Sequence, residues 1–581
     1  MKKRIATILL TMLMLTASVS MIGCGGKSES ATADVTSDVA VEEAPAAEAP
    51  AEIYMEAEAN LYYEEATEAE ESMDGESAEQ TSYLDSCYDY AVVEPLPHEE
   101  NTEEYSKWEE KGYTSVKKEP LSTFSADVDT ASYSNLRRMI RDGYSMDELP
   151  ENSVRIEEML NYFTYDYKEP EGSEPFGVTT QIGKCPWNDE AELVMIGLQT
   201  ESIDYEKTPS SNLVFLLDVS GSMYDEDKLP LLQESFCMLA ENLTEKDRVS
   251  IVTYAGDDTV VLSGVSGDKT RKIQSALMGL EAGGGTHGSK GIETAYELAE
   301  EYFIEGGNNR VILATDGDLN IGLTSEEELE ELITEKKESG IFLSVLGFGT
   351  GNIKDNKMET LADKGNGNYA YIDSVREAKK VLVEEMTATL LTICKDVKFQ
   401  VEFNPAVVSQ YRLLGYENRA LAKEDFADDT KDAGEIGAGH SVTVLYEVIL
   451  KNPLESLANE EIEELKYSEE YKEEYAEDTE VTSENAAFEK EWFTLSIRYK
   501  KPAEDESSLL AYPIEYASYQ HKPSDDFKFA AAVAEFGLLA SKSEEAADAS
   551  LQNVKKVLKG IELEDEYKEE FYELVKEIDN N

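Results

Sequence analysis

The chain has 581 residues, of which 41% are hydrophobic and 9% aromatic, and its 52 Lys and Arg stand against 122 Asp and Glu, a formal net charge of −70. The charge excludes a nucleic-acid-binding protein held by phosphate contacts, because the summed field repels a polyanion. The apolar content is sufficient for buried cores, so the chain is not disordered throughout. At roughly 150 residues per domain, the length predicts three or four folding units.

The first 24 residues have the pattern of an export signal. Residues 2–4 are basic, an apolar run covers Ile5–Ile22, and Cys24 follows it. The pattern resembles a bacterial lipoprotein signal, with Met21 where leucine is commoner, and this resemblance implies cleavage and lipidation at Cys24. A signal peptide cut elsewhere, or one retained as a short anchor, is the alternative. Since no later stretch is long and apolar enough to cross a membrane, we expect an extracytoplasmic protein held at the cell membrane by a lipid.

An acidic segment follows the signal. Residues 28–106 contain no Lys or Arg and are rich in Ala, Glu and Pro. Such a segment repels itself and cannot bury enough apolar surface to fold. We therefore predict a signal peptide over residues 1–24 and an acidic disordered stalk over residues 25–120.

Apolar periodicity marks the start of the folded body. One helix is expected around Leu136–Ile140, with Asp129 or Thr130 as its N-cap, and a second over Val154–Phe163. Two strands complete an N-terminal flanking domain over residues 121–210. They are Val178–Ile182 and Leu193–Leu198.

Strands alternate with helices from residue 211 to residue 393. The run Leu213–Leu217 is apolar throughout, as expected of a strand buried on both faces. This alternation predicts a doubly wound, mostly parallel, Rossmann-like α/β sheet. We expect the domain to end in one long helix that reaches about Leu391. The other expected strands are Val249–Tyr254, Thr259–Leu262, Val311–Ala314, Phe342–Leu346 and Tyr369–Ile372.

The hydrophobic period changes to two in the C-terminal flanking domain, residues 394–581. Apolar and polar residues alternate over three segments, which predicts half-buried strands of a β-sandwich. An acidic insertion at about 460–484 separates two of them, and terminal helices follow, one of which Ser524 can cap. The three segments are Val397–Phe403, Val442–Val448 and Phe493–Tyr499.

The two flanking domains are expected to share this sandwich. The strands Val178–Ile182 and Leu193–Leu198 are too few to form a stable sheet alone. The α/β domain would then be an insertion in the sandwich, which is tolerable because domain termini often lie close together.

Oxygen-bearing side chains follow the strands of the α/β domain. Asp218-Val-Ser220-Gly-Ser222 comes after the first strand, Thr286 lies in a glycine-rich loop, and Asp316 follows a later strand, at an end expected to border solvent. Ligands of such sheets bind beyond the carboxyl ends of the strands. Hard divalent cations prefer oxygen ligands, so the pattern predicts a Mg²⁺ or Mn²⁺ site.

This combination resembles the metal-ion-dependent adhesion site of von Willebrand factor type A (VWA) domains. The resemblance implies that Ser220 and Ser222 bind the metal directly, that Thr286 binds directly or through water, and that Asp218 and Asp316 act mainly through water. It also implies a protein partner that supplies a carboxylate to the metal. His287, beside Thr286, is expected to be a solvent-facing loop residue.

Longer motifs resemble the segments that flank the VWA domain in YfbK-like bacterial lipoproteins. The resemblance covers about residue 121 to the end and implies architecture better than biochemical role. The motifs are Phe124–Tyr133, Val154–Phe163, Cys185–Trp187, Tyr411–Arg419 and Asp432–His440.

Enzyme chemistry is disfavoured by the same motifs. Phosphoryl-transfer sites with Asp-x-Asp need a second acid where Ser220 stands, and the loop Gly283–Gly288 is followed by Ser289-Lys290 rather than Lys-Ser/Thr. There are four histidines and no Gly-x-Ser-x-Gly elbow. We therefore expect a binding protein and no enzyme. The alternatives are an envelope scaffold with a non-essential metal site and a metal-dependent hydrolase or phosphatase.

The five cysteines do not make a disulfide scaffold. Cys237 lies among apolar helix positions and is expected to be a buried thiol. Spacing does not decide whether disulfides form among the other candidates, which are Cys87, Cys185 and Cys394.

Overall fold

The computed structural model describes residues 102–126, 129–203, 208–284, 290–317, 326–385, 388, 390–451, 491–502, 504, 506–515, 518–546 and 548–579. All of them belong to one compact unit, Val93–Asn581. The predicted signal peptide, Cys24, most of the stalk and the acidic insertion lie outside the described residues.

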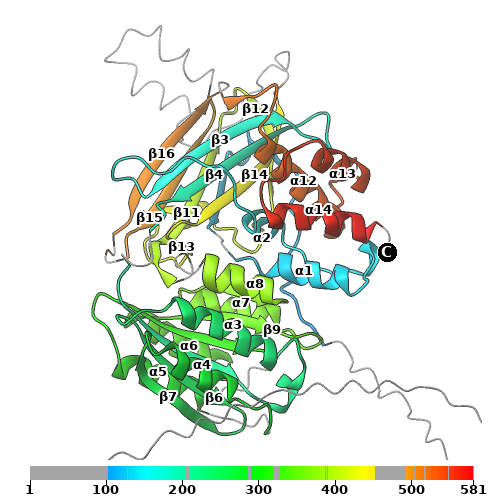
Figure 1. Ribbon diagram of the computed structural model, residues 1–581. Helices are drawn as coiled ribbons and strands as arrows, with labels where there is room; N and C mark the ends of the chain where they lie inside the picture. Colours follow the sequence, from blue (N-terminus) through cyan, green and yellow to red (C-terminus); the bar gives the residue numbers. More distant parts are fainter. Residues whose placement is uncertain are drawn as a thin grey trace, which may run out of the picture. The chain divides into compact units, whose positions relative to one another are not determined.

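A six-stranded sheet forms the centre of the α/β domain (Figure 1). Its order is β10-β9-β8-β5-β6-β7, and every neighbouring pair is parallel except β6 and β7. The strands are β5 (Ser211–Asp218), β6 (Arg248–Tyr254), β7 (Asp258–Ser266), β8 (Asn308–Thr315), β9 (Ile341–Phe348) and β10 (Tyr369–Ile372). The doubly wound sheet expected from the alternation is confirmed.

Helices cover both faces of this sheet, which explains the apolar run in β5. Leu213, Phe215 and Leu217 pack with α3 and α4 on one face, whereas Val214 and Leu216 pack with α5, α6 and α7 on the other. The helices are α3 (Leu229–Asn242), α4 (Thr270–Met278), α5 (Gly291–Glu301), α6 (Glu326–Glu338) and α7 (Asp355–Lys364).

Two further sheets form the β-sandwich, and its apolar core lies between them. One sheet has the order β1-β12-β14-β4-β3, and the other has β13-β11-β15-β16 with β2 paired to β11. Strands from both sides of the α/β domain pair directly, for example Ile196 of β4 with Val444 of β14. The α/β domain is therefore an insertion in a shared sandwich, as predicted. The strands are β1 (Thr114–Ser115), β2 (Leu121–Ser125), β3 (Phe176–Lys184), β4 (Glu192–Thr200), β11 (Thr392–Phe403), β12 (Val408–Leu414), β13 (Gly434–Gly437), β14 (Ser441–Leu450), β15 (Glu491–Lys500) and β16 (Ser508–Glu515).

Helices from both flanking domains pack on the outer face of the sheet β1-β12-β14-β4-β3 (Figure 1). As a result β14 is buried on both faces: Val444 faces the sandwich core and Leu445 faces the helices. The expectation of half-buried strands is therefore wrong for β14. Ser524 caps α12 as predicted, through a bond from the Phe527 amide. The helices are α1 (Ala131–Arg141), α2 (Ile156–Asn161), α12 (Asp525–Ala540), α13 (Leu551–Lys559) and α14 (Glu566–Ile578), and short helical turns are η1 (Met146–Glu148) and η5 (Lys423–Ala427).

The first described residues differ from the expected stalk. Thr114–Ser115 forms β1 and pairs with β12, and Glu104 forms a parallel bridge with Lys354. Residues 102–120 therefore contact the folded body, and a stalk that reaches residue 120 is too long. This segment lacks apolar periodicity, because backbone hydrogen bonds and ion pairs hold much of it.

Two local predictions also fail. Thr130 is the N-cap of α1 but makes no side-chain cap bond, and Asp129 instead accepts bonds from the Tyr369 amide and from Arg419. The second is the long α-helix expected to reach Leu391. The α-helical part, α8 (Val375–Lys379), ends after one turn and continues as a π-helical turn, η4 (Lys380–Glu384).

Among the described residues, no helix combines the length and apolar character that crossing a membrane requires. Cys185 and Cys394 are buried free thiols, and Cys237 is a free thiol that is only half-buried. Cys87 lies outside the described residues.

Candidate metal centre

Two carboxylates lie at the carboxyl edge of the α/β sheet. Asp218 is the last residue of β5, and Asp316 directly follows β8. These strands are parallel neighbours, with Leu217 opposite Ala314, so their ends meet at one edge. Asp218 and Asp316 are each 1% exposed. The prediction that Asp316 borders solvent is therefore wrong.

The serine loop after β5 turns back over Asp218. The amide of Ser220 donates to Asp218 Oδ1 at 2.9 Å, and the Thr315 hydroxyl donates to Oδ2 at 3.2 Å. Ser220 then begins a short 3-10 helix, η3 (Gly221–Tyr224), whose Met223 side chain is fully buried. The Asp218 carboxylate thus orients the loop by accepting the Ser220 amide, and the buried Met223 side chain packs the loop against the core.

The two serine hydroxyls of this loop lie together. Ser220 Oγ and Ser222 Oγ are 2.9 Å apart. Ser220 is 2% exposed, whereas Ser222 is exposed. The alternate spacing of the serines therefore brings one buried and one exposed hydroxyl together at this edge of the sheet.

The third predicted segment is described only in part. Thr286 and His287 lie outside the described residues. The start of their loop contacts the serine loop, because the Gly283 amide donates to the Val219 carbonyl at 2.9 Å. Gly284 has φ +91°, and a Cβ there would lie 2.7 Å from the Ala255 carbonyl oxygen, so glycine is required at this close approach.

A lysine that the sequence analysis did not consider completes the edge. Lys228 Nζ lies 3.0 Å from Asp316 Oδ2, and the two side chains are 9% and 0% exposed. Lys228 is the N-cap residue of α3, six residues after Ser222. A lone lysine among Asp225, Glu226 and Asp227 gives no sequence signal for this contact, since any of these acids could have paired with it.

The buried position changes the electrostatics of Asp218. Burial raises the pKa of Asp218 to about 6, against the hydrogen bonds from Ser220 that lower it. Burial also raises the pKa of Tyr254, and the Asp218 carboxylate adds to that rise. A positive charge at this edge would lower both pKa values, because it stabilises the ionised forms of Asp218 and Tyr254.

One distance among the described residues fits a divalent cation. Ligands at 2.0–2.1 Å around Mg²⁺ place neighbouring octahedral oxygens about 2.9 Å apart, which equals the separation of the two serine hydroxyls. In the described ranges no three His, Cys, Asp or Glu side chains could hold a metal together. A metal here would therefore depend on hydroxyl ligands, with the carboxylates as charge and hydrogen-bond partners.

Three family models match the chain. One described as "von Willebrand factor type A domain" matches residues 212–384, one described as "von Willebrand factor" matches residues 99–195, and one described as "Uncharacterized protein YfbK, C-terminal" matches residues 388–580. The fold and these matches define a protein with a VWA domain. VWA domains mediate protein interaction and commonly bind a divalent metal.

Comparison with curated proteins identifies the family. "Uncharacterized protein YfbK" of Escherichia coli (strain K12) is 39% identical over 487 residues, which cover 82% of this chain and 81% of that protein. The chain belongs to the YfbK family. "Inter-alpha-trypsin inhibitor heavy chain H4" of Homo sapiens is 29% identical over 150 residues, 24% of this chain and 16% of that protein. The chain thus spans only a small part of that second relative.

Among solved structures, a "von Willebrand factor type A" protein from Catenulispora acidiphila matches with a TM-score of 0.38 and 12% identity. The match covers 68% of this chain and 88% of that chain.

Proposed function

We propose that this protein is a lipid-anchored, extracytoplasmic binding protein that captures a protein partner through a divalent metal at the carboxyl edge of its VWA domain. The observation that carries the proposal is a pair of serine hydroxyls 2.9 Å apart in the loop after Asp218, at a sheet edge with two buried carboxylates. The family supports it, because VWA domains mediate protein interaction.

Each side chain has a distinct role in this proposal. Ser220 and Ser222 would hold Mg²⁺ or Mn²⁺ directly, while Asp218 orients their loop and Asp316 supplies negative charge. Thr286 would complete the ligand set. A bound dication with weak hydroxyl ligands supplies an electrophilic position for one carboxylate of the partner.

An exposed aromatic side chain borders the same loop. Tyr224 is 80% exposed and lies two residues after Ser222 on η3. Tyrosine is enriched among the residues that dominate binding energies at protein interfaces. Tyr224 therefore gives the partner an apolar contact beside the metal.

The proposal is tested by affinity capture from native envelope extract with the full mature chain as bait. We expect a partner to be retained in Mg²⁺, released by EDTA and absent with Ser222→Ala. Ser339→Ala is the matched control, since its exposed hydroxyl bonds the Lys336 carbonyl far from the serine loop in the sequence. Equal capture by wild type and Ser222→Ala, or capture that survives EDTA, would exclude the metal-dependent mode.

We also propose that Cys24 carries the lipid. The supporting pattern is the basic start, the apolar run and the cysteine at residue 24. Mass spectrometry of the mature N-terminal peptide should find a diacylglyceryl-modified Cys24, and Cys24→Ala should move the protein from the membrane to the soluble fraction. An unmodified N-terminus elsewhere would contradict the lipid anchor and leave the metal site unaffected.

A further inference from the structure

Lys228 pairs with a carboxylate that is distant in the sequence. Three acids, Asp225, Glu226 and Asp227, precede Lys228 directly, yet its ammonium reaches the buried strand-end carboxylate of Asp316. Burying both charges has a desolvation cost that their attraction often does not repay, so such a pair is weak evidence for a purely stabilising role. A role in the adjoining metal centre is the alternative.

The protein backbone holds the Lys228 side chain in this direction. Gly349 has φ +73°, and a Cβ at that position would lie 2.4 Å from Lys228 Cγ and 2.5 Å from Lys228 Cε. The Gly349 carbonyl accepts a bond from the Tyr371 hydroxyl at 2.8 Å. The absence of a side chain at residue 349 thus makes room for the lysine stem, and the loop that provides the room is itself anchored.

We propose that Lys228 is an internal counter-charge of the metal centre, and that it makes tight metal binding conditional on an anionic ligand. This inference rests on the proposed function, since it concerns the same site. Without a metal, the ammonium compensates Asp316, so the folded domain does not need the dication to neutralise this carboxylate.

Charge at the loaded site gives the reason for the coupling. With Asp218 and Asp316 ionised, two negative charges face one lysine and one dication, which leaves a net charge of +1. Without Lys228 the same set is neutral. The positive charge lowers the affinity for the metal alone and raises the affinity of the loaded site for a carboxylate. Lys228 therefore favours simultaneous binding of metal and partner over binding of metal alone.

The test is a Mn²⁺ titration of the full mature chain, in chloride and in acetate at equal ionic strength. Electron paramagnetic resonance measures the free Mn²⁺ at each point. Acetate is the probe for the carboxylate. We expect Lys228→Met to bind Mn²⁺ roughly tenfold or more tightly than wild type in chloride, the size typical of changes beside metal ligands. Acetate should strengthen Mn²⁺ binding to wild type more than to Lys228→Met.

Two further variants make the result interpretable. Lys228→Arg keeps the charge and should resemble wild type, while Lys501→Met removes an exposed lysine paired with the exposed Glu504 and should change nothing. A thermal melt reports folding: Lys228→Met should be less stable than wild type without metal and recover with Mn²⁺. If Lys228→Met does not fold, Lys228→Gln, which also removes the charge, replaces it in the same chloride and acetate titrations.

The outcomes separate this inference from the proposed function. If wild type binds no Mn²⁺ in either buffer, the metal-dependent function itself fails. If wild type binds Mn²⁺ but Lys228→Met has equal or weaker affinity, Lys228 does not act through its charge, and only the present inference is overturned. Acetate-independent binding to wild type would also overturn it.

Discussion

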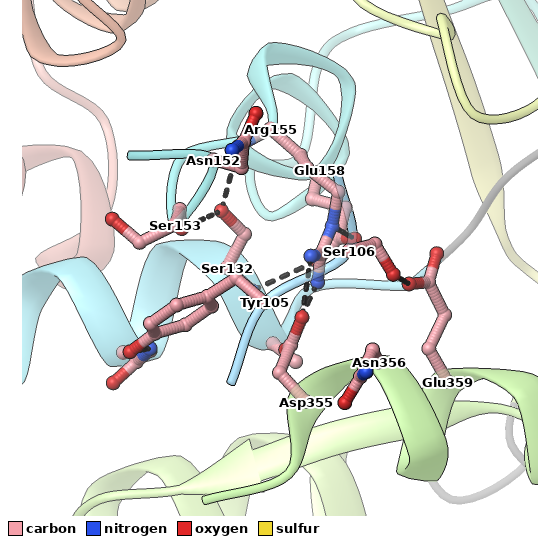
Figure 2. Close-up of polar contacts among 12 residues, drawn as sticks. Tyr105, Ser106, Ser132, Asn152, Ser153, Arg155, Glu158, Asp355, Asn356 and Glu359 are labelled. Atoms are coloured by element: carbon pink, nitrogen blue, oxygen red, sulfur yellow. Dashed lines mark hydrogen bonds and ion pairs between the residues drawn. The ribbon is translucent and has the colours of Figure 1, made fainter. Parts of the chain in front are cut away.

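Arg155 and Asp355 join the helices of the N-terminal flanking domain to the VWA domain. Arg155 Nη1 lies 2.6 Å from Asp355 Oδ2 and Nη2 lies 3.1 Å from Oδ1, and the side chains are 1% and 2% exposed. Arg155 precedes α2, whereas Asp355 is the first residue of α7 (Figure 2). Arg155 Nε also pairs with Glu158, whose other oxygen accepts the Ser132 amide at 2.8 Å.

Two more arginines repeat this arrangement. Arg137 of α1 is fully buried and pairs with Glu377 of α8 at 2.7 Å. Arg419 lies 3.2 Å from Glu359 of α7. The VWA domain is therefore held to the flanking elements by buried ion pairs as well as by the covalent connections of an inserted domain.

The first prediction concerns this contact. Arg155→Met leaves the carboxylates of Glu158 and Asp355 buried without their cation, and breaking a buried pair in this way costs about 3–5 kcal/mol. We expect the free energy of unfolding, measured in urea, to fall by that amount. Lys501→Met, which removes the cation of an exposed pair with Glu504, should cost less than about 1 kcal/mol. A loss below about 1 kcal/mol in Arg155→Met as well would show that the Arg155 contact does not stabilise the fold.

The second prediction separates metal binding from folding. The Ser222 side chain is exposed, and its hydroxyl contacts that of Ser220. If Ser222 is the direct ligand that we propose, Ser222→Ala should lower Mn²⁺ affinity, while the free energy of unfolding without metal stays within about 0.5 kcal/mol of wild type. Asp316→Ala is a poorer test, because it removes the carboxylate that pairs with the buried Lys228 and should also destabilise the fold by about 3 kcal/mol. Unchanged Mn²⁺ affinity in Ser222→Ala would remove this serine from the ligand set.

The sheet edge was predictable from sequence, whereas its lysine was not. An apolar strand followed by Asp-x-Ser-x-Ser places Asp218 at a carboxyl end, and the ends of parallel strands meet at one edge. The direction of Lys228 depends on a backbone that leaves room at Gly349, in a loop after β9. No local pattern around Lys228 contains that information.

The start of the body was hidden for a similar reason. Hydrophobic periodicity detects buried faces of helices and strands, so it marked Leu121 and missed the segment before it. Thr102 and Glu104 donate their amides to the carbonyls of Gly351 and Ile353, each at 2.9 Å. Such contacts involve backbone groups that every residue type carries, and they leave no mark in the sequence.

The third prediction concerns pH. Burial raises the pKa of Glu417 to about 7, and the carboxylate of Glu110 adds to the rise, while Arg412 and Lys111 oppose it. The unfolded chain releases this proton near pH 4.3, so the folded state binds more protons between about pH 4.3 and 7, and stability falls as pH rises through that window.

Glu417→Gln removes this titration. Between pH 5.5 and pH 8 the wild type should lose about 2 kcal/mol more unfolding free energy than the variant does, measured by urea denaturation at the two values. Glu424→Gln, an exposed neighbour, is the control and should follow wild type. Parallel pH profiles for wild type and Glu417→Gln would contradict a protonated Glu417 in the folded state, whose side chain is half-buried.

The last prediction concerns the point where the acidic segment meets the body. Glu103 is 3% exposed in its side chain and lies 3.0 Å from Arg138 Nη2, and it accepts the Gly351 amide at 3.0 Å and the Tyr105 hydroxyl at 2.9 Å. Its neighbour Glu104 pairs with Lys354 but is 51% exposed. Two adjacent glutamates thus carry the same charge in opposite environments.

Glu103→Ala should destabilise the protein by about 2–3 kcal/mol, because it removes hydrogen bonds to a charged group and leaves Arg138 short of a partner. Glu104→Ala should cost less than about 1 kcal/mol, as exposed pairs do. Hydrogen exchange should show faster exchange of the Thr102 and Glu104 amides in Glu103→Ala than in wild type, since their bonds to the Gly351 and Ile353 carbonyls depend on the same anchor. Equal stability and equal exchange in the two variants would mean that Glu103 does not hold this segment, and that the backbone bonds of Thr102 and Glu104 attach it to the VWA domain without that anchor.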